Sequence, residues 1–411
     1  MKSAPCRNCS SSVGTVFADL GMSPLANEYL AQDDLTRMQR FFPLKAYVCD
    51  KCLLVQLEDI QSPEAIFSDY AYLSSSSSSW LEHAQSYVER IIPALGLDHT
   101  TRVVELASND GYLLQFFVQR GIPALGVEPA ANVAKVAISK GVPTRTEFFG
   151  LRVATEIATE GRAKLVIANN VVAHVPDLHD FLEGVRIVLA DDGLFTAEFP
   201  HLLNLISRLE FDTIYHEHFS YFSLRVIKDV LSQHGLSVVD VEELPTHGGS
   251  LRLHARPTEG VTAKTVTSRV QRILEQEQDQ GLDDIDRYRT FEGTIRQAKR
   301  NLLRQLISYK EEGKTIAGYG APAKAATLFN YCGIDVDILD FTTDTNPLKQ
   351  GRYIPGTGIP IYHPQKIMDA RPDLIWILPW NLKDEIMASL ESISGWGGHF
   401  LVWDGELREV P

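Results

Sequence analysis

The chain has 411 residues, 44% of them hydrophobic, which is enough for two or three domains with their own cores. Its 39 Lys and Arg against 53 Asp and Glu give a formal net charge of −14, which disfavours a general binder of nucleic acid. No apolar run is long enough to span a membrane, and the first residues lack the hydrophobic stretch of an export signal, so we expect a cytoplasmic protein without a membrane partner.

Four cysteines form two CxxC pairs, Cys6 with Cys9 and Cys49 with Cys52. Four thiolates complete a tetrahedral zinc site and leave no open coordination position, so the metal is expected to be structural. Disulfides are the alternative, but the fifth cysteine, Cys332, and the lack of an export signal favour a reducing compartment. We therefore predict a zinc domain over residues 1–70, which the Zn²⁺ helps to stabilise.

A serine run at 74–79 follows the zinc region and leads into Trp80. It is either a flexible linker or a ligand contact. The next apolar residues have helical spacing: Leu81, Ala84, Val88 and Ile91. Hydroxyls and amides at the start of a helix suit an anion, which makes three serines candidates for substrate binding: Ser75, Ser77 and Ser78.

The central part of the chain alternates expected strands and helices. Strands are expected at 102–106, 124–128, 164–169 and 193–199, and helices at 112–119 and 131–139. This alternation predicts an α/β fold with a doubly wound parallel sheet.

The first strand of this region runs into the turn Ala107-Ser108-Asn109-Asp110-Gly111, and the second strand ends in Glu128. The order resembles class I methyltransferases that use S-adenosylmethionine, in which small turn residues admit the cofactor and the acid binds the ribose hydroxyls. An NAD-binding Rossmann unit also ends its second strand in an acid, but the first turn here lacks GxGxxG. The candidate cofactor contacts are Glu105, Ala107, Ser108, Asn109, Gly111 and Glu128.

The last third of the chain predicts a second, smaller α/β unit. Residues 262–310 have a helical pattern and would connect the domains. Strands are expected at 314–320, 338–341 and 374–378.

Several motifs, taken together with the paired CxxC sequences, resemble the nucleotide-sugar C-methyltransferases of deoxysugar biosynthesis. They lie in the family's order over essentially the whole chain, at 169–177, 215–221, 247–252, 318–324 and 346–356. The resemblance implies a zinc domain, a class I methyltransferase domain with a Rossmann-like fold over 71–260 and a Rossmann-like α/β domain over 311–411. The helical connector predicted from the pattern, over 261–310, lies between the last two. The resemblance also implies a substrate between the domains, a nucleotide-linked, typically dTDP-linked, 4-keto-deoxysugar methylated at C3, or at C5 in some members.

The chain departs from the family pattern at two places. Ala107 stands where the family often has glycine, and Asp344-Thr345-Asn346 stands where it often has Asp-Asp-Asn. Neither change removes a polar group assigned to catalysis, so they bear on substrate identity more than on reaction type.

Methylation of carbon requires a base to remove a proton next to the ketone and donors to stabilise the oxygen that gains charge. The family resemblance assigns His218 as the base. Tyr215 and His174 would orient or stabilise the oxygen, Glu217 would orient an imidazole or bind the sugar, and Tyr72 matches a family active-site tyrosine. A metal site at His216-Glu217-His218 is the alternative interpretation of this cluster. Asn169 and Asn170 are further candidate cofactor contacts.

Basic residues beside glycine turns are candidates for the phosphates. The turn 318–324 is expected to open a helix, so its amides and Lys324 would face an anion, although a packing role is equally compatible with the sequence. Lys349 and Arg352 are either pyrophosphate contacts or surface charges.

Three other functions are compatible with parts of the pattern. An O- or N-methyltransferase would use the base on a heteroatom of a sugar or other metabolite. A zinc-dependent RNA or protein methyltransferase and a non-catalytic binding module are the others. We expect a monomer or a weak oligomer.

Overall fold

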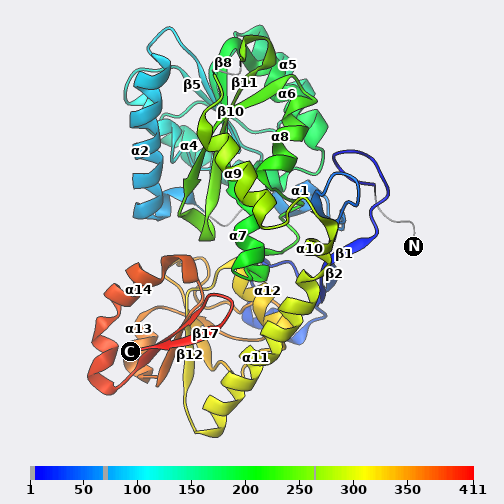
Figure 1. Ribbon diagram of the computed structural model, residues 1–411. Helices are drawn as coiled ribbons and strands as arrows, with labels where there is room; N and C mark the ends of the chain where they lie inside the picture. The colour runs from blue at the N-terminus through cyan, green and yellow to red at the C-terminus, as the bar shows by residue number, and fades with distance from the viewer. Residues whose placement is uncertain (1–4, 68–72, 263–264) are drawn as a thin grey trace.

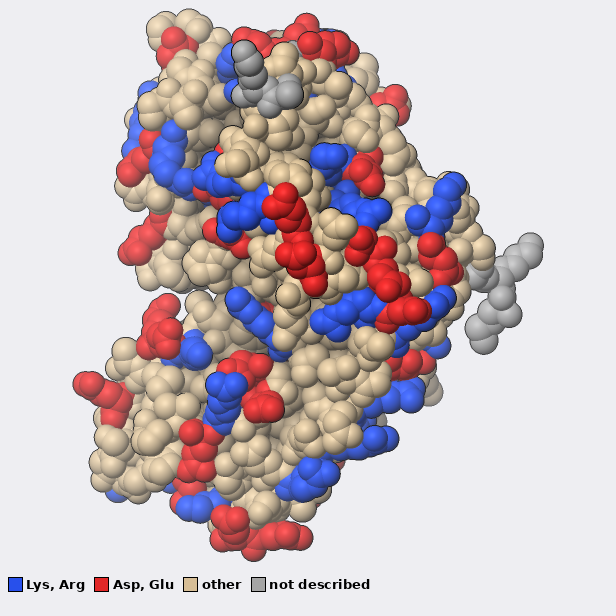
Figure 2. All heavy atoms as spheres, viewed as in Figure 1, with Lys and Arg blue, Asp and Glu red and all other residues tan. Residues whose placement is uncertain are grey.

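The computed structural model describes residues 5–67, 73–262 and 265–411 (Figure 1). Its central and C-terminal regions form two lobes, and the N-terminal strands β1 and β2 lie along one side where the lobes meet (Figure 1). Lys and Arg are interspersed with Asp and Glu over the face drawn in Figure 2, and neither charge covers it alone. No helix in the described ranges is both long enough and apolar enough to cross a bilayer.

The N-terminal region forms a four-stranded antiparallel sheet in the order β1-β2-β3-β9. Its strands are β1 (Thr15–Ser23), β2 (Phe42–Val48), β3 (Val55–Leu57) and β9 (Ser220–Tyr221). The short strand β9 comes from the middle of the chain and pairs Tyr221 with Val55. The N-terminal sheet is therefore completed by residues that directly follow the predicted catalytic cluster.

The central sheet has seven strands in the order β10-β11-β8-β7-β4-β5-β6. Only β11 runs antiparallel to its neighbours, β8 and β10. The bounds are β4 (Val103–Leu106), β5 (Ala124–Val127), β6 (Thr144–Arg145), β7 (Ala163–Asn169), β8 (Leu189–Pro200), β10 (Leu236–Leu244) and β11 (Ser250–Pro257). The predicted doubly wound sheet of a class I methyltransferase is confirmed.

Helices cover both faces of the central sheet because its buried strands are apolar on both faces. Val103, Leu165 and Ile167 belong to the cluster with α2 and α3, whereas Val104 and Val166 belong to the cluster with α5 and α6. The helices of this region are α1 (Pro63–Phe67), α2 (Ser78–Leu95), α3 (Leu114–Val118), α4 (Ala131–Ser139), α5 (Leu151–Thr159), α6 (Leu178–Val188), α7 (Leu202–Ser207) and α8 (Leu224–Ser232).

Three helices connect the lobes where a helical stretch was expected: α9 (Ser268–Asp279), α10 (Ile285–Arg289) and α11 (Phe291–Glu311). Glu277 on α9 is 2% exposed and ties the connector to the central region. It bonds to Nε2 of His201 at 2.7 Å and accepts from the amide of Arg225, at the start of α8, at 3.0 Å.

The C-terminal sheet has six strands in the order β14-β13-β12-β15-β16-β17. Its elements are β12 (Ile316–Tyr319), α12 (Ala323–Cys332), β13 (Phe341–Thr343), β14 (Ile361–Tyr362), α13 (Gln365–Ala370), β15 (Leu374–Ile377), α14 (Lys383–Ser389), β16 (His399–Trp403) and β17 (Leu407–Val410).

The strand expected at 338–341 is wrong in position, because β13 begins only at Phe341. Asp335 holds the preceding residues in a turn. Its carbonyl accepts from the amides of Ile338 and Leu339, and its side chain accepts from the amide of Asp337. The apolar run was therefore a buried turn followed by a strand.

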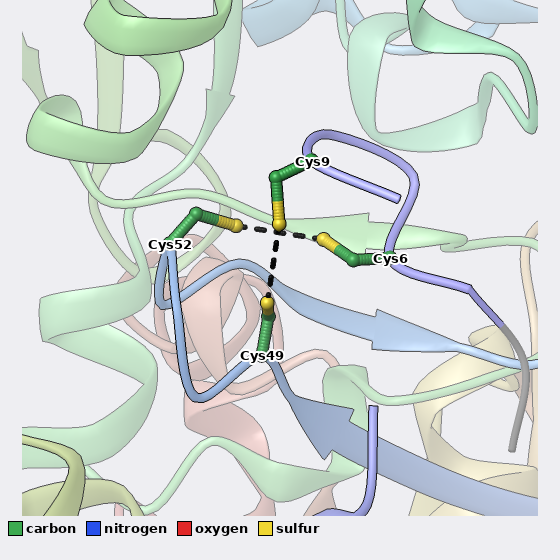
Figure 3. Close-up of side chains that lie close together, drawn as sticks. All are labelled: Cys6, Cys9, Cys49 and Cys52. Atoms are coloured by element: carbon green, nitrogen blue, oxygen red, sulfur yellow. Dashed lines mark hydrogen bonds between the residues drawn. The ribbon is translucent and has the colours of Figure 1, made fainter. Parts of the chain in front are cut away.

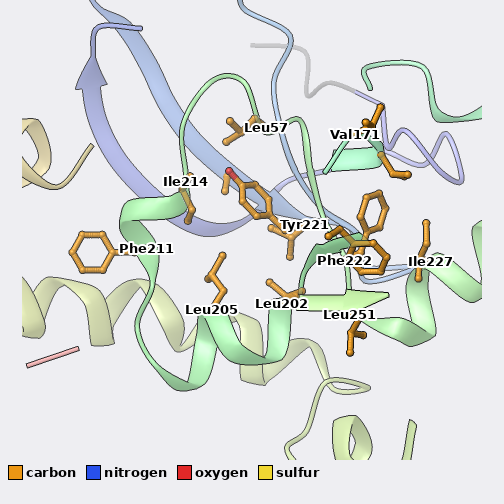
Figure 4. Packing of buried hydrophobic residues seen from close by; sticks show 14 of the residues in the cluster. Leu57, Val171, Leu202, Leu205, Phe211, Ile214, Tyr221, Phe222, Ile227 and Leu251 are labelled. Carbon is orange, nitrogen blue, oxygen red and sulfur yellow. The ribbon is translucent and has the colours of Figure 1, made fainter. Parts of the chain in front are cut away.

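One hydrophobic cluster extends through all three regions. It contains Phe17 of β1, Phe199 of β8 and Trp376 of β15. Figure 4 shows part of it, where Tyr221 and Phe222 lie among apolar side chains that include Leu57, Leu202 and Leu205. The segment that carries β9 is thus anchored by packing on both sides.

Candidate active site

The four cysteines converge on one point. Their Sγ atoms all lie within 4.8 Å of one another, with Cys6 and Cys52 at 3.4 Å and Cys9 and Cys49 at 3.5 Å (Figure 3). All four are free thiols, so the disulfide alternative is not supported. Four thiolates at these separations fit Zn²⁺ with Zn–S bonds of about 2.3 Å.

Contacts to the central region hold the loop between Cys6 and Cys9 in place. His179 on α6 bonds through Nε2 to the carbonyl of Asn8 at 2.8 Å, and Gln233 donates to the Asn8 side chain at 2.8 Å. Arg7 Nη1 donates to the carbonyl of Phe219, next to β9, at 2.9 Å. The zinc cluster is therefore linked to the segment that follows His218.

The turn after β4 has the geometry expected of a cofactor site. Asn109 has a left-handed backbone with φ +49° and donates its amide to Glu128 Oε2 at 2.9 Å. Glu128 Oε1 accepts from the amide of Ala130 at 2.9 Å. Burial raises the pKa of Glu128, and the two amide hydrogen bonds oppose that shift. The carboxylate is thus fixed in place and keeps further lone pairs for ribose hydroxyls.

Ala107 also adopts a left-handed backbone, with φ +50°. This conformation costs an L-residue roughly 1–2 kcal/mol and costs glycine little. The structure therefore explains the glycine that the resembling family often has at this position.

Several buried polar atoms at this edge of the sheet have no hydrogen-bond partner within the described chain: Glu105 Oε2, Ser108 Oγ and Asn169 Oδ1. Burial raises the pKa of Glu105 well above its ordinary value, and the nearby Glu128 and Asp110 carboxylates add to the shift. Polar atoms left without partners in a protein interior are costly. They therefore fit a polar cofactor, and S-adenosylmethionine carries an amine, hydroxyls and an adenine that bond to such groups.

The serine run docks onto this turn. Ser74 donates its amide to Asn109 Oδ1 at 2.8 Å, and the hydroxyl of Ser75 bonds to Asp110. Ser77 caps α2 by accepting from the amide of Trp80 at 3.3 Å, and Ser78 is the first residue of that helix. The structure thus places Ser75 against the cofactor turn, while Ser77 and Ser78 lie at the helix start that the sequence predicted.

The Tyr215–His218 segment brings two imidazoles together. His218 and His174 make an edge contact with ring centroids 4.6 Å apart, and the Tyr215 ring lies 4.1 Å from His218. His218 Nδ1 lies 2.8 Å from the Thr213 carbonyl, and His174 Nδ1 lies 2.8 Å from the Glu217 carbonyl. A carbonyl only accepts, so each Nδ1 carries the proton and each neutral ring has an unprotonated Nε2.

Burial keeps both imidazoles neutral. It lowers the pKa of His174 to about 4, against a backbone hydrogen bond that opposes the shift, with a smaller lowering from His247. It lowers the pKa of His218 well below its ordinary value, with smaller contributions from His174 and His247. His218 also lines a small cavity together with Thr213, Ser220 and Tyr221.

Glu217 and His216 face other partners. Glu217 Oε1 accepts from Asn27 at 2.7 Å, and burial raises the pKa of Glu217 to about 7. His216 Nε2 donates to the carbonyl of Pro43 at 3.1 Å, toward the N-terminal sheet. Over residues 5–67, 73–262 and 265–411, the four cysteines are the one group of three or more ligands with metal-site spacing, which counts against the metal interpretation of His216-Glu217-His218.

The predicted phosphate contacts lie around the turn after β12. Lys324, in the first turn of α12, bonds to Asn381 and lies 3.7 Å over the Trp380 ring. Lys349 Nζ donates to the carbonyl of Ala321 at 2.9 Å. Arg352 is exposed and donates to the carbonyl of Tyr29 at 3.3 Å. Lys349 thus joins the same turn as Lys324, whereas Arg352 lies toward the N-terminal region.

Of the remaining predicted residues, Asn170 and Gly111 lie at the cofactor edge with left-handed backbones, and Tyr72 lies outside the described residues. Asn27, the hydrogen-bond donor to Glu217, was not predicted, because 190 residues separate the two and a lone asparagine carries no motif.

A buried charged network at the end of β8 was not predicted either. Glu198 Oε2 lies 2.8 Å from Arg252 Nη2 and 3.0 Å from His83 Nε2, and Arg252 lies 4.5 Å over the Tyr87 ring. The backbone carbonyl of Glu198 accepts from the amide of Asn170 at 2.6 Å. Two charged residues within apolar strands, Glu198 in β8 and Arg252 in β11, were the sequence signals for a buried ion pair.

Family models match three successive segments of the chain. They are a "Putative zinc binding domain" over residues 6–67, a methyltransferase domain over 80–241 and a C-methyltransferase C-terminal domain over 245–403. The C-methyltransferase NovU of Streptomyces niveus is 38% identical over 409 residues, which is 98% of this chain and 96% of NovU.

Two solved structures resemble part of the chain. Magnesium protoporphyrin IX methyltransferase of Synechocystis PCC 6803, with bound SAH, is 16% identical over 43% of this chain and 82% of its own, with a TM-score of 0.35. The 1,6-didemethyltoxoflavin-N1-methyltransferase of Burkholderia thailandensis is 17% identical over 50% and 95%, with a TM-score of 0.35. Similarity at this level transfers no activity.

Proposed function

The chain belongs to the family of S-adenosylmethionine-dependent C-methyltransferases, and we propose that it methylates C3 of a nucleotide-linked 4-keto-deoxysugar. Its cofactor is S-adenosylmethionine, and its four-cysteine cluster binds zinc. A cytoplasmic setting and a dTDP carrier belong to the same proposal.

The observation that carries the proposal is the pair of neutral imidazoles beside Tyr215. A ketone acidifies the adjacent C–H bond, so a neutral histidine with a free Nε2 is a suitable base. His218 fits this role because its Nδ1–H is fixed on the Thr213 carbonyl, which leaves Nε2 to accept the proton from C3.

The other residues of the cluster have supporting roles. Tyr215 would donate its hydroxyl to the ketone oxygen as it gains charge. His174 has an unprotonated Nε2, so it would orient the sugar by accepting from one of its hydroxyls. Glu217, with a pKa near 7, would both donate and accept hydrogen bonds to sugar hydroxyls, and Asn27 fixes its orientation. When bound, S-adenosylmethionine supplies the electrophilic methyl group.

The test uses the full chain, methyl-labelled S-adenosylmethionine and a panel of dTDP-linked 4-keto-6-deoxysugars, with products assigned by NMR. A label on the ring carbon next to the ketone supports the proposal. A label on oxygen or nitrogen supports the heteroatom alternative and overturns the carbon-acid mechanism.

Solvent exchange tests the base directly. In D₂O without methyl donor, the wild type should exchange the C3 hydrogen, and His218→Asn should lose that exchange while still binding the sugar nucleotide. The matched control is His363→Asn, which changes an exposed histidine. Near wild-type turnover by His218→Asn would overturn the assignment of the base.

A further inference from the structure

The loop over residues 245–249 joins β10 to β11 and lies at the cofactor edge of the central sheet. Ser250, which follows it, pairs with Pro200, the last residue of β8. The parallel strands β4, β7 and β8 end at this same edge. The loop is thus placed beside the candidate active site.

The residues on both sides of His247 are held in place. Thr246 donates its hydroxyl to Glu198 Oε1 at 2.8 Å, and Asn204 donates to the carbonyl of Gly249 at 3.0 Å. A Cβ on Gly248 would lie 2.5 Å from Glu210 Oε1 and 2.5 Å from a ring carbon of Trp380, so only glycine fits. Position 247 therefore cannot shift freely along the loop.

His247 itself has a left-handed backbone, with φ +52° and ψ +34°, and its side chain is exposed. This conformation is uncommon for residues other than glycine, and strained backbone concentrates at functional sites. The geometry thus presents the imidazole to the space outside the sheet edge.

That space adjoins both the catalytic cluster and the cofactor turn. The His247 ring meets the edge of Trp80 with centroids 5.2 Å apart, and Trp80 stacks on Tyr112 beside the cofactor turn at 6.2 Å. His247 also contributes to the lowered pKa of His174 and of His218, although less than burial does.

Lys324 approaches the same space from the C-terminal lobe. Its ammonium lies 3.7 Å over the ring of Trp380, the indole that closes on Gly248. An imidazole from one lobe and an ammonium from the other are thus flanked by two indoles, Trp80 and Trp380. Burial lowers the pKa of His247 to about 4, so its ring is neutral and offers an N–H donor, while Lys324 offers an ammonium. Such a set suits an anionic phosphate group joined to ring systems, because the donors bind the oxygens and the aromatic faces pack against the rings.

We infer that His247, together with Lys324, binds the diphosphate that links the sugar to its nucleoside, so that His247 helps to select nucleotide-linked sugars over free sugars. This inference rests on the proposed function. It assigns the loop 245–249 a direct contact with substrate, separate from the base and from the cofactor turn.

The test compares His247→Asn with the wild type by calorimetric titration of dTDP and of S-adenosylhomocysteine. Asparagine tolerates the left-handed backbone, so the variant removes the imidazole and keeps the loop. Arg371→Asn is the matched control, because Arg371 is exposed, has φ +50° and follows the last residue of α13.

His247→Asn should bind dTDP about tenfold more weakly, with unchanged binding of S-adenosylhomocysteine and an unchanged melting temperature. In turnover, KM for the sugar nucleotide should rise by about the same factor while kcat changes little. Binding of dTDP within about twofold of the wild type would overturn the inference. Parallel loss of S-adenosylhomocysteine binding would overturn it as well, because that result indicates a structural role.

Failure of the proposed function gives a different result. A wild type that binds S-adenosylhomocysteine but neither dTDP nor any dTDP-sugar of the panel would overturn the proposed function, and the inference with it. A wild type that binds dTDP and a variant that binds it equally well would overturn the inference alone.

Discussion

Arg252→Met tests the buried network at the end of β8. Arg252 and Glu198 are both 0% exposed and lie 2.8 Å apart. Although burial opposes it, the contacts with His83 and Arg252 lower the pKa of Glu198 from 4.5 to about 2. At 1.36 kcal/mol per pKa unit, this shift corresponds to about 3 kcal/mol of stabilisation of the carboxylate. Removing one partner of a buried ion pair lowers the unfolding free energy by a similar amount, roughly 3–5 kcal/mol.

The assay is urea unfolding followed by tryptophan fluorescence. Arg252→Met should lose about 3 kcal/mol at pH 7. Because the folded pKa of Glu198 is depressed, this stabilisation is present above pH 4.5 and is lost as the pH falls toward 2. The difference between variant and wild type should therefore shrink over that pH range.

Two further variants sharpen the result. Arg256→Met is the matched control on the same strand, since Arg256 is partly exposed and bonds only to backbone carbonyls, and it should lose less than about 1 kcal/mol. Adding Glu198→Gln to Arg252→Met should restore part of the lost stability, because no unpaired charge remains. A loss below about 1 kcal/mol for Arg252→Met would refute the reasoning.

Three further predictions concern the metal, the cofactor turn and the pH dependence. Metal analysis should find zinc bound to the wild type and lost from Cys49→Ser, whose melting temperature should fall by roughly 10 °C; a variant that keeps both would contradict the four-thiolate site. Because Ala107 has a left-handed backbone, Ala107→Gly should keep its affinity for S-adenosylhomocysteine in calorimetry, whereas Ala107→Val should lose about 2 kcal/mol of unfolding free energy. Equal unfolding free energies of the two variants would contradict backbone strain at this position. Burial raises the pKa of Glu217 to about 7, so the protonated carboxyl stabilises the fold below pH 4.5 and this contribution is lost as the pH rises through 7. In urea unfolding, Glu217→Gln should therefore reduce the loss of unfolding free energy over this pH range by about 3 kcal/mol, and an unchanged pH dependence would contradict the raised pKa.

Local sequence signals predicted the four-cysteine cluster and the geometry of the turn after β4. The CxxC spacing brings each cysteine pair together, and an acid at the end of a strand next to a small-residue turn placed Glu128 beside Asn109. These features depend on residues that are close in sequence or on the regular return of parallel strands to one edge.

Contacts between distant segments were not predictable in the same way. The hydrogen bond from Asn27 to Glu217 depends on how the N-terminal sheet docks, and neither residue shows it in the sequence. The burial of Glu198 with Arg252 requires the antiparallel insertion of β11 beside β8. The strand at 338–341 was misplaced because the Asp335 turn competes with extended structure for the same apolar residues.

The pairing of β9 with the N-terminal sheet limits which segments of this protein can be exchanged with a relative. The N-terminal sheet is complete only when Ser220 and Tyr221 pair with β3, so this sheet cannot be cut out as a continuous cassette. During synthesis the cysteines leave the ribosome long before their last strand partner. A chimera that exchanges only the N-terminal residues with a relative would join one protein's zinc sheet to another protein's catalytic segment. We expect such hybrids to work only when the residues around β9 are exchanged with the N-terminal part.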